Sequence, residues 1–583
     1  MVWKTQLKSL VILLTVLLMA SACSPGPKYP DFSSVSADSI RSHHQALYDI
    51  STKAGGLDSG IRLNDAGARA ADYITSVYKS AGLQNVRQEE FLPLRWWPEN
   101  YGVTAFTPGQ PSGKQLVAFP LWYCEGIDNE ELDLVYVGYG TPGEWAGVNV
   151  QDKAVLMDMK RIMHFIPSWQ NTMGKQIARD IGAKAIILAD TLVDSPSGIS
   201  AGNGGSIKDQ KGQNAELYSI PGFSIGKSDG DFLRNALKSG PVKVKLNLKY
   251  SMNPTKAVNV VGELPGNGKV DEYIVIGGHY DTWFNGALDN LGSQASMIEM
   301  AKYLSSIPQS QRDRNIIFVS LFGHEYGGET SKPNAAMGHA AFVEKHPELK
   351  NKVTCFLDID GSGSWGYEEV KNTGVIAPTN KDDKSGIFAT SWALTEMAEE
   401  GIQKYGKGPW GMYPVSTFVA DLAGPIGDAG WPCLMIISKH IYYHSLLDTM
   451  EKITPDQVYR RTLMNLDIVK KLLDSPAGFI LAIDGNPSKA RDVKDINNVS
   501  VQVIPLTIKA GSLAIAWPGY WDDDLVVRPD GFAFDFGDGT TPVTGKVATG
   551  HVYEKPGTYT VTMTINDIAG RRGVASQDVI VIP

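Results

Sequence analysis

The sequence predicts an α/β fold in which a mostly parallel mixed sheet lies between helices, with a second α/β unit inserted and a β-sandwich at the end. Three patterns predict it. Residues 256–475 alternate short apolar strands with helical segments, as parallel sheets covered by helices on both faces do. Residues 115–250 contain strand-like segments between Gly, Pro and Asp turns. Residues 558–565 alternate Thr with Tyr, Val, Met and Ile, which indicates a strand with one buried face.

The expected elements follow from hydrophobic periodicity. Apolar positions three and four apart predict a helix over 66–81, which Gly82 ends. In the main sheet we expect strands and helices over 273–278, 292–304, 315–321, 353–359, 388–405 and 433–437. In the insertion we expect strands over 132–140, 153–159 and 183–190. The resulting domains are 37–114 with 251–480 (main), 115–250 (inserted) and 496–583 (sandwich), the last following a polar linker.

The composition excludes several classes of protein. Of the 583 residues, 43% are apolar and 20% charged, which is ordinary for a globular chain. The 54 Lys and Arg against 63 Asp and Glu leave no basic surplus to neutralise a phosphate backbone, so we expect no nucleic-acid partner. Four Cys are too few for a disulfide scaffold, and Cys355 and Cys433, in apolar stretches, are expected to be buried free thiols.

The first 22 residues have the features of an export signal. Lys4 and Lys8 precede a short apolar run that ends at Ala20, too short to span a bilayer comfortably. Cys23 directly follows small residues, which resembles a bacterial lipoprotein signal, although Ala20 stands where Leu is usual. The resemblance implies that Cys23 is acylated, that 23–36 form a tether, and that the protein is an exported, membrane-anchored lipoprotein of the cell envelope. The alternative is ordinary secretion with a free Cys23.

Polar clusters follow the predicted strands of the main domain. They contain His279 and Asp281, Asp289, His324 and Glu325, Asp360, and His444. Open α/β sheets bind ligands at the carboxyl ends of their strands. Each cluster alone has an ordinary explanation, such as a helix cap or a turn, but their joint placement at successive strand ends favours a site.

His and carboxylate ligands without Cys are typical of a hydrolytic zinc-type site. Five ligands can hold two ions if one carboxylate bridges them, and two ions about 3.5–4 Å apart can activate a shared water. His279 and Asp281 are two residues apart in extended chain and point the same way, so we expect Asp281 to orient the His279 ring. Asp448, four residues after His444, is a candidate for the same role toward His444.

The motifs HYDTW, ALDN, FGHEYG, FLDIDG and YYHSLLDT resemble those of the co-catalytic zinc exopeptidases, which include bacterial aminopeptidases and glutamate carboxypeptidase. The resemblance implies a phosphorylase/hydrolase-like fold, two Zn²⁺ ions and hydrolysis of peptides by metal-activated water. It implies that His279 and Asp360 hold one ion, that Glu325 and His444 hold the other, and that Asp289 bridges. The ligand set also suits cobalt or manganese. Aminopeptidase activity is expected first, with carboxypeptidase activity open.

Two further segments resemble known domains. Within 115–250, VYVGYG, GVNVQDKAVLMD and GAKAIIL resemble the protease-associated domain that is often inserted in this family. Near the end, DFGDG and HVYEKPGTY resemble a polycystic-kidney-disease (PKD) domain, an adhesive β-sandwich.

One position departs from the family pattern. The family has two adjacent Glu residues, a general base and then a ligand, whereas this chain has His324 and Glu325. Imidazole, with a pKa of about 6.5, can accept a proton at neutral pH, so His324 is the expected proton shuttle, and it could also bind metal. Glu329 is a second candidate for the base. The alternative is a peptidase-fold binding protein whose catalysis was altered with the loss of the Glu.

Overall fold

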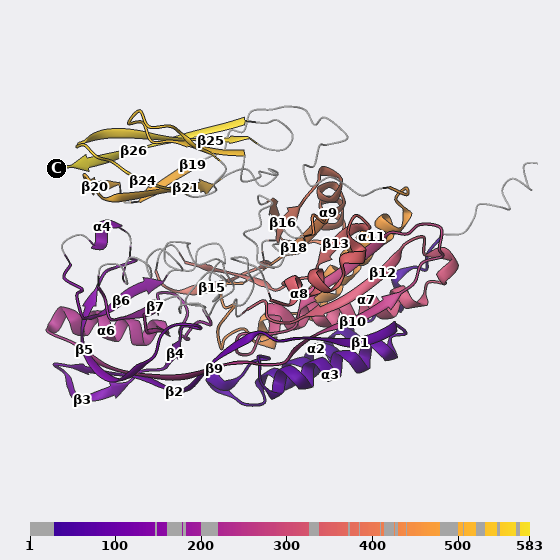
Figure 1. Ribbon diagram of the computed structural model, residues 1–583, viewed down its shortest axis with the longest axis horizontal. Coiled ribbons are helices and arrows are strands. Elements are labelled where there is room, and N and C mark those ends of the chain that lie inside the picture. Colours follow the sequence, from indigo (N-terminus) through magenta and orange to yellow (C-terminus); the bar gives the residue numbers. More distant parts are fainter. Residues whose placement is uncertain are drawn as a thin grey trace, which may run out of the picture.

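The computed structural model describes residues 28–140, 142–145, 148–159, 178, 182–199, 220–325, 337–370, 373–383, 385–408, 410–412, 425, 429–438, 440–478, 500–504, 506–520, 531–544, 549–566 and 572–583. The predicted signal, Cys23 and Glu329 lie outside these residues. Figure 1 shows three parts: the main α/β domain on the right, the inserted unit at lower left and the sandwich at upper left.

The main domain is built on an eight-stranded mixed sheet. Its order is β1 (Gln84–Phe91), β10 (Ala257–Leu264), β12 (Asn315–Leu321), β11 (Tyr273–His279), β13 (Val353–Asp358), β18 (Cys433–Ile437), β16 (Ser385–Ala389), β17 (Trp410–Met412). The four central strands, β12, β11, β13 and β18, are parallel, while β1, β10 and β16 pair antiparallel with their inner neighbours. The predicted mostly parallel sheet is therefore confirmed at its centre, where the strands are buried on both faces.

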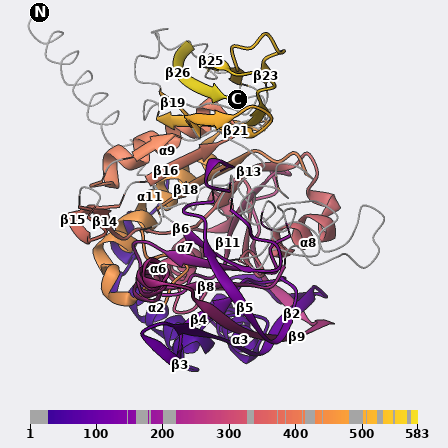
Figure 2. The same cartoon turned by 90° about the vertical axis from the view of Figure 1, so that its left-hand side faces the viewer.

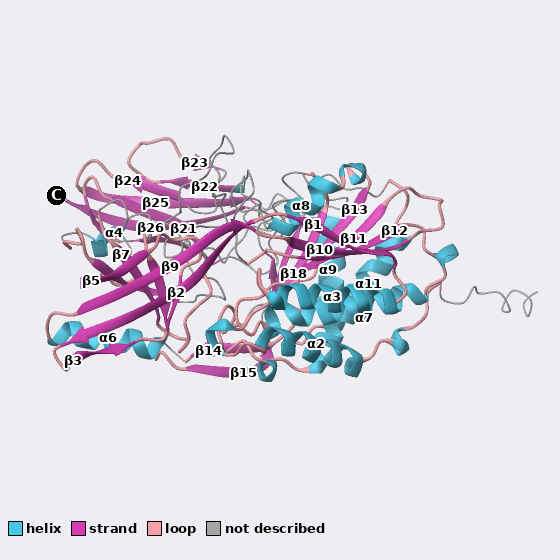
Figure 3. Ribbon diagram, turned by 60° about the horizontal axis from the view of Figure 1, so that its bottom comes forward, coloured by secondary structure: helices cyan, strands magenta, loops and turns pink. Residues whose placement is uncertain are grey.

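Helices cover this sheet on both faces (Figure 3). One layer contains α2 (Ala37–Thr52), α3 (Asp65–Ser80), α7 (Ser293–Ser306), α9 (Trp392–Tyr405) and α11 (Pro455–Asp474). On the other face, α8 (Met337–Lys345) packs Phe342 onto Val275, Val319 and Phe356 of the sheet. The N-termini are set locally, because Ser36, Asn64, Ser391 and Thr454 each cap a helix through their side-chain oxygen.

One predicted helix begins later than expected. Residues 385–389 form strand β16, in which Phe388 pairs with Met435 of β18, and α9 starts only at Trp392. The helix start predicted at residue 388 is wrong. An apolar residue such as Phe388 fits the helical pattern and the strand pattern equally well, so the local sequence could not decide between them. The pairing of Phe388 with a strand almost fifty residues away decided the conformation, and local pattern cannot report such a partner.

The insertion has its own eight-stranded sheet and begins earlier than residue 115. Its order is β3 (Gln110–Gln115), β2 (Leu94–Thr107), β9 (Lys243–Pro254), β5 (Ile127–Tyr136), β6 (Ala154–Met159), β7 (Ala185–Asp190), β8 (Gly222–Ile225), β4 (Ala118–Pro120). It also carries α4 (Pro142–Trp145) and α6 (Lys227–Ser239). Because β2 pairs along its length with β9, residues 94–115 belong to this sheet and not to the main domain, a correction to the predicted boundary.

The C-terminal part is a two-sheet β-sandwich, seen at the top of Figure 2. One sheet is β19 (Ser500–Ile504), β21 (Leu513–Tyr520) and β24 (Thr549–Val552). The other is β20 (Thr507–Lys509), β26 (Arg572–Ile582), β25 (Gly557–Asn566), β22 (Phe532–Asp535) and β23 (Val543–Thr544). In β25 the side chains of Val561, Met563 and Ile565 are buried in the core, which confirms the predicted alternation.

Two further observations concern the cysteines and possible membrane-spanning helices. Cys124, Cys355 and Cys433 are all buried free thiols, as predicted for the last two. Across the described ranges, no helix combines the length and apolar character that crossing a membrane requires.

Candidate metal centre

The five predicted ligands meet at one edge of the main sheet. His279 ends β11, Glu325 follows β12, Asp360 follows β13 and His444 follows β18. These four strands are parallel neighbours, so their carboxyl ends lie side by side. Asp289 comes from η4 (Ala287–Gly292), the turn before α7.

Their ligand atoms form two groups that share Asp289. In the first, His279 Nε2 lies 3.3 Å from Asp289 Oδ1 and 3.6 Å from Asp360 Oδ1. In the second, His444 Nε2 lies 3.2 Å from Asp289 Oδ2 and 2.9 Å from Glu325 Oε2. Each group could hold one metal ion, and the two oxygens of Asp289 face different groups. This geometry is compatible with the bridged arrangement that the family resemblance implies, and the assignment of these residues as ligands stays a prediction.

The donor atoms fit cations better than they fit one another. His279 Nε2 and His444 Nε2 are buried and face only carboxylate oxygens, at 2.9 to 3.6 Å, and Glu325 Oε1 is buried without a hydrogen bond to any described residue. Around them lie four buried carboxylates, of Asp281, Asp289, Glu325 and Asp360, against three imidazoles. Buried carboxylates in excess need a compensating positive charge, and two divalent ions at these groups would supply it.

Asp281 holds the site through its backbone as well as its side chain. Its carbonyl oxygen accepts a hydrogen bond from His279 Nδ1 at 3.0 Å, which leaves Nε2 of that ring facing Asp289 and Asp360. The Asp281 carboxylate accepts the backbone N–H groups of His324 (3.2 Å) and Glu325 (3.0 Å). The expected orienting contact therefore uses the carbonyl, while the carboxylate fixes the neighbouring loop.

The comparisons with known proteins agree with this geometry. Residues 259–469 match the model of Peptidase family M28, and residues 520–582 match a PKD domain. The segment 259–469 is called the M28 domain below, after the family model that it matches. All five predicted ligands lie inside this M28 domain.

Several curated relatives of the chain carry peptidase names, whereas another, 32% identical over 106 residues, is "Transferrin receptor protein 1" of Gallus gallus. The chain is 24% identical over 246 residues to "Aminopeptidase NAALADL1" of Mus musculus, covering 40% of this chain and 31% of the relative. It is 22% identical over 433 residues to "Glutamate carboxypeptidase 2 homolog" of Caenorhabditis elegans, covering 57% and 54%. The chain thus spans about half the length, or less, of these curated relatives.

A solved structure shares the fold. The zinc aminopeptidase BSAP from Bacillus subtilis aligns with a TM-score of 0.55 at 18% identity, covering 77% of this chain and 98% of that one. At this identity the likeness shows the fold. That fold extends beyond the M28 domain, because the aligned share exceeds residues 259–469.

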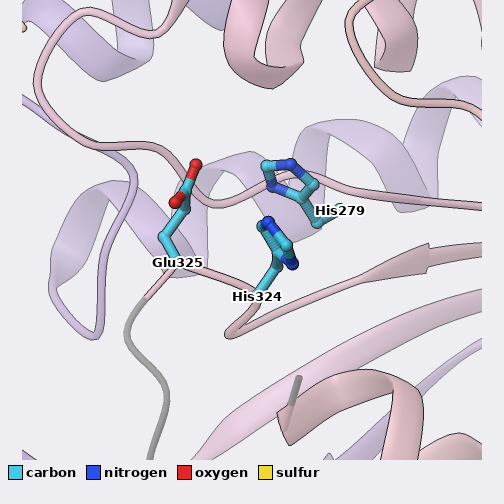
Figure 4. A group of neighbouring side chains, drawn as sticks. All are labelled: His279, His324 and Glu325. Atoms are coloured by element: carbon cyan, nitrogen blue, oxygen red, sulfur yellow. The ribbon is translucent and has the colours of Figure 1, made fainter. Parts of the chain in front are cut away.

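His324 lies among the ligands of the M28 domain (Figure 4). Its ring centroid is 4.3 Å from that of His279, with the planes inclined by 33°. Ligand atoms of His279, His324 and Glu325 also lie close enough together to form a third possible metal group. His324 is half-buried as a residue, while its ring Nδ1 is buried.

Sequence reasoning missed the residues that hold Asp289. The Asp448 carboxylate accepts the backbone N–H groups of Leu288 (3.0 Å) and Asp289 (3.2 Å) and lies 3.2 Å from His440 Nε2. The position of Asp448 four residues after His444 suggested that Asp448 orients His444. The chain turns between them, however, and the Asp448 carboxylate faces η4 and His440. His44 of α2 donates from Nε2 to the Ala287 carbonyl at 2.6 Å, and burial lowers its pKa to about 4, which keeps the ring neutral.

Two amides in the M28 domain fix the other ligands. Asn290 donates to the Ile359 carbonyl (3.0 Å) and accepts the Gly361 N–H (3.1 Å), so it holds the chain on both sides of Asp360. Gln294 donates to the carbonyls of Gly278 and His279 and accepts from Ser320. The signal available in the sequence was their position beside Asp289 at the start of α7, which a helix cap would equally explain.

The carboxylates shift the pKa values of both ligand histidines. Burial alone lowers the pKa of His279, but Asp281, Asp289 and Asp360 outweigh it and raise the value well above the ordinary range. Burial also lowers the pKa of His444, but Glu325 and Asp289 raise it to about 8. Without metal, protons therefore occupy the positions that cations would take.

This predicts opposite pH dependences for the metal-free and zinc-loaded protein. Protonated His444 stabilises the metal-free fold fully below its unfolded pKa of about 6.5, and this contribution is lost as the pH rises through about 8. The shift corresponds to about 2 kcal/mol. Zinc must displace the protons, so its stabilisation grows over the same range. Urea unfolding of chelator-treated and zinc-loaded protein between these pH values measures both trends, and His444→Gln should flatten the metal-free one. A metal-free stability that rises with pH across this window would contradict the prediction.

Proposed function

We propose that this chain is an exported dizinc aminopeptidase that removes residues from peptides by metal-activated hydrolysis. The single observation that carries the proposal is the pair of ligand groups sharing Asp289 at the sheet edge. Family membership of the M28 domain, relatives named as peptidases and a fold shared with a zinc aminopeptidase support the same conclusion.

The residues of the chain divide the work by their positions. His279, Asp289 and Asp360 would hold one zinc ion, and Asp289, Glu325 and His444 the other. When bound, two zinc ions lower the pKa of water and polarise the scissile carbonyl. His324, whose ring lies beside that of His279, accepts a proton from the attacking water and returns it to the leaving amine. Asp281 keeps His279 and the His324–Glu325 loop in place through the hydrogen bonds described above.

The test is a substrate panel on protein reconstituted with zinc. Aminoacyl-anilides report aminopeptidase activity, and N-blocked acidic dipeptides report carboxypeptidase activity. Cleavage of the anilides that disappears with a chelator and returns with zinc is the expected result. Cobalt and manganese are compared in parallel, because the ligand set suits them too. A zinc-binding protein that cleaves neither class of substrate would contradict the proposed function.

Two other functions are favoured by particular observations. Relatives named glutamate carboxypeptidase, such as the Caenorhabditis elegans homologue, favour a carboxypeptidase, which the acidic dipeptides would reveal. His324 at the position of the family's general base favours a peptide-binding protein with altered catalysis. That candidate predicts peptide binding without turnover, and turnover only in His324→Glu.

The inserted unit and the C-terminal domain are assigned accessory roles. We propose that residues 94–254 are a protease-associated domain, on the sequence resemblance, and that the PKD domain binds a partner outside the catalytic centre. The acidic balance of 63 Asp and Glu against 54 Lys and Arg still argues against nucleic acid as that partner.

Lipidation at Cys23 predicts a membrane-bound protein in a bacterial host. Replacing Cys23 by Ser should move the protein from the membrane fraction to the soluble exported fraction and abolish labelling by radioactive palmitate. Measured activity of the released protein should be unchanged, since Cys23 lies outside the M28 domain. The matched control is Cys124→Ser, at a buried thiol of the inserted unit, which should stay with the membrane. Retention of Cys23→Ser in the membrane fraction would contradict lipidation.

A further inference from the structure

A short segment of the inserted unit reaches the metal centre. Residues 195–199, which we call the strap, follow β7 of the inserted sheet and are all buried. The strap lies against residues 441–447 of the main domain, the loop that carries the predicted ligand His444. Figure 1 shows the inserted unit beside the main domain.

The strap holds the backbone of this loop by hydrogen bonds. Gly198 N–H donates to the His444 carbonyl at 2.8 Å, and Ser197 Oγ donates to the same oxygen at 3.4 Å. Ser195 Oγ accepts the Leu446 N–H at 3.1 Å. A β-bridge between Ser197 and Ser445 completes the contact. The ligand residue is therefore fixed at its own carbonyl and two residues further on.

Apolar contacts join the same segments. Leu192 and Val193, just before the strap, form a small cluster with Ile441 of the ligand loop. Gly198 packs so closely on Trp283 that a Cβ at this position would lie 2.3 Å from the indole ring. Trp283 follows Asp281 in the HYDTW motif, so the strap also touches the segment that carries His279.

The conformation of His444 explains why such support is needed. His444 has φ of 57°, in the left-handed region that a non-glycine residue rarely adopts. Such a conformation persists only where the surroundings hold it. The strap, which belongs to the inserted unit, supplies hydrogen bonds at the carbonyl of this residue and at the N–H of Leu446.

We propose that the strap is a positioning element for His444, so that the inserted unit determines how tightly the second metal ion is held. The inference deepens the proposed function and rests on the two-ion centre assumed there. Only the group of Asp289, Glu325 and His444 contains the residue that the strap holds, whereas His279 and Asp360 belong to the other group. Loosening the strap should therefore weaken one ion more than the other.

The experiment uses the full chain with Ser195→Ala and Ser197→Ala combined. Zinc bound per chain is measured while free zinc is lowered with a series of chelator buffers. We expect one of the two zinc ions to bind about tenfold more weakly, as for other residues that orient metal ligands, and the other to change much less. The weakened ion should be the one that His444→Ala also loses. Ser239→Ala, which removes a hydroxyl from α6 of the same unit, is the matched control and should leave both ions unchanged.

Gly198→Ala is the stronger variant, because its Cβ must push the strap away from Trp283. It should weaken the same ion by more than the double Ser variant. Thermal unfolding of the metal-free proteins is measured alongside, because a purely structural strap would lower the melting temperature without separating the two ions. That result, or equal weakening of both ions, would overturn the proposal.

The outcomes separate this inference from the proposed function. A wild-type chain that binds two zinc ions but cleaves no peptide would remove the proposed activity, while selective loss of one ion in the variants would still support the strap. A wild-type chain that binds fewer than two ions would overturn both. Two ions held equally well in wild type and variants would overturn the strap alone.

Discussion

Replacement of Asp289 by Ala is expected to lower kcat/KM for peptide hydrolysis by at least about a thousandfold, equivalent to about 4 kcal/mol of transition-state stabilisation. One candidate group contains His279 and Asp360, and the other contains Glu325 and His444. Asp289 is the residue that these two groups share. Its oxygens lie 3.3 Å from His279 Nε2 and 3.2 Å from His444 Nε2. Without this carboxylate neither ion keeps its full set of ligands.

The measurement combines zinc analysis with kinetics. Zinc in Asp289→Ala should fall from two ions per chain to one or none, and added zinc should not restore activity. Asp158→Asn is the matched control: Asp158 is also a buried carboxylate, but it binds Tyr136 and Arg234 inside the inserted unit. It should cost stability and leave both zinc ions in place. Full activity in Asp289→Ala would remove the two-ion centre from consideration.

Replacement of His324 by Gln is expected to lower kcat by about a hundredfold to ten thousandfold, the usual contribution of a general base. Gln keeps a polar side chain of similar length but cannot take up a proton at neutral pH. Because His324 is not one of the five predicted ligands, both zinc ions should remain bound and KM should change little. A loss of zinc together with activity would instead assign His324 to the third possible metal group.

His324→Glu separates the two candidate roles of this position. If His324 is the proton shuttle, a carboxylate can replace it, and activity should stay well above that of His324→Gln. If the wild type is a binding protein, only His324→Glu should turn over substrate. His346→Gln, at a half-buried His that is paired with Glu89 and Glu348 away from the predicted ligands, is the control and should keep wild-type kcat. Unchanged kcat in His324→Gln would contradict the shuttle.

Most of the main sheet could be predicted because its central strands are short runs of apolar residues between polar ends. The predicted strands 273–278, 315–321 and 433–437 match β11, β12 and β18 to within one residue. Parallel strands buried on both faces leave this pattern whatever their neighbours. Two of the predictions that were wrong, the boundary at 115 and the helix start at 388, depended on a strand partner far away in sequence. The strand predicted over 132–140 is also shifted, because β5 spans Ile127–Tyr136.

The candidate site was predictable at the level of ligand types and less so at the level of their supports. His279, Asp289, Glu325, Asp360 and His444 stand out because His and carboxylates repeatedly follow apolar strands. Their assignment as ligands stays a prediction until metal is measured. The supports are single polar residues, such as Asn290 or Ser195 of the strap. Each of these two contacts a residue about 70 or about 250 positions away in the sequence. No local pattern distinguishes them from caps and turns.

The sequence by itself determined the class of sheet, the sandwich strand and the residues that could bind metal, because burial and ligand chemistry depend on residue type and local spacing. The tertiary structure alone decided that the Asp448 carboxylate faces η4 and His440, that Asp281 binds His279 through its carbonyl, and that the inserted unit grips the His444 loop. Each of these contacts depends on the relative orientation of two segments. That orientation exists only in the folded chain.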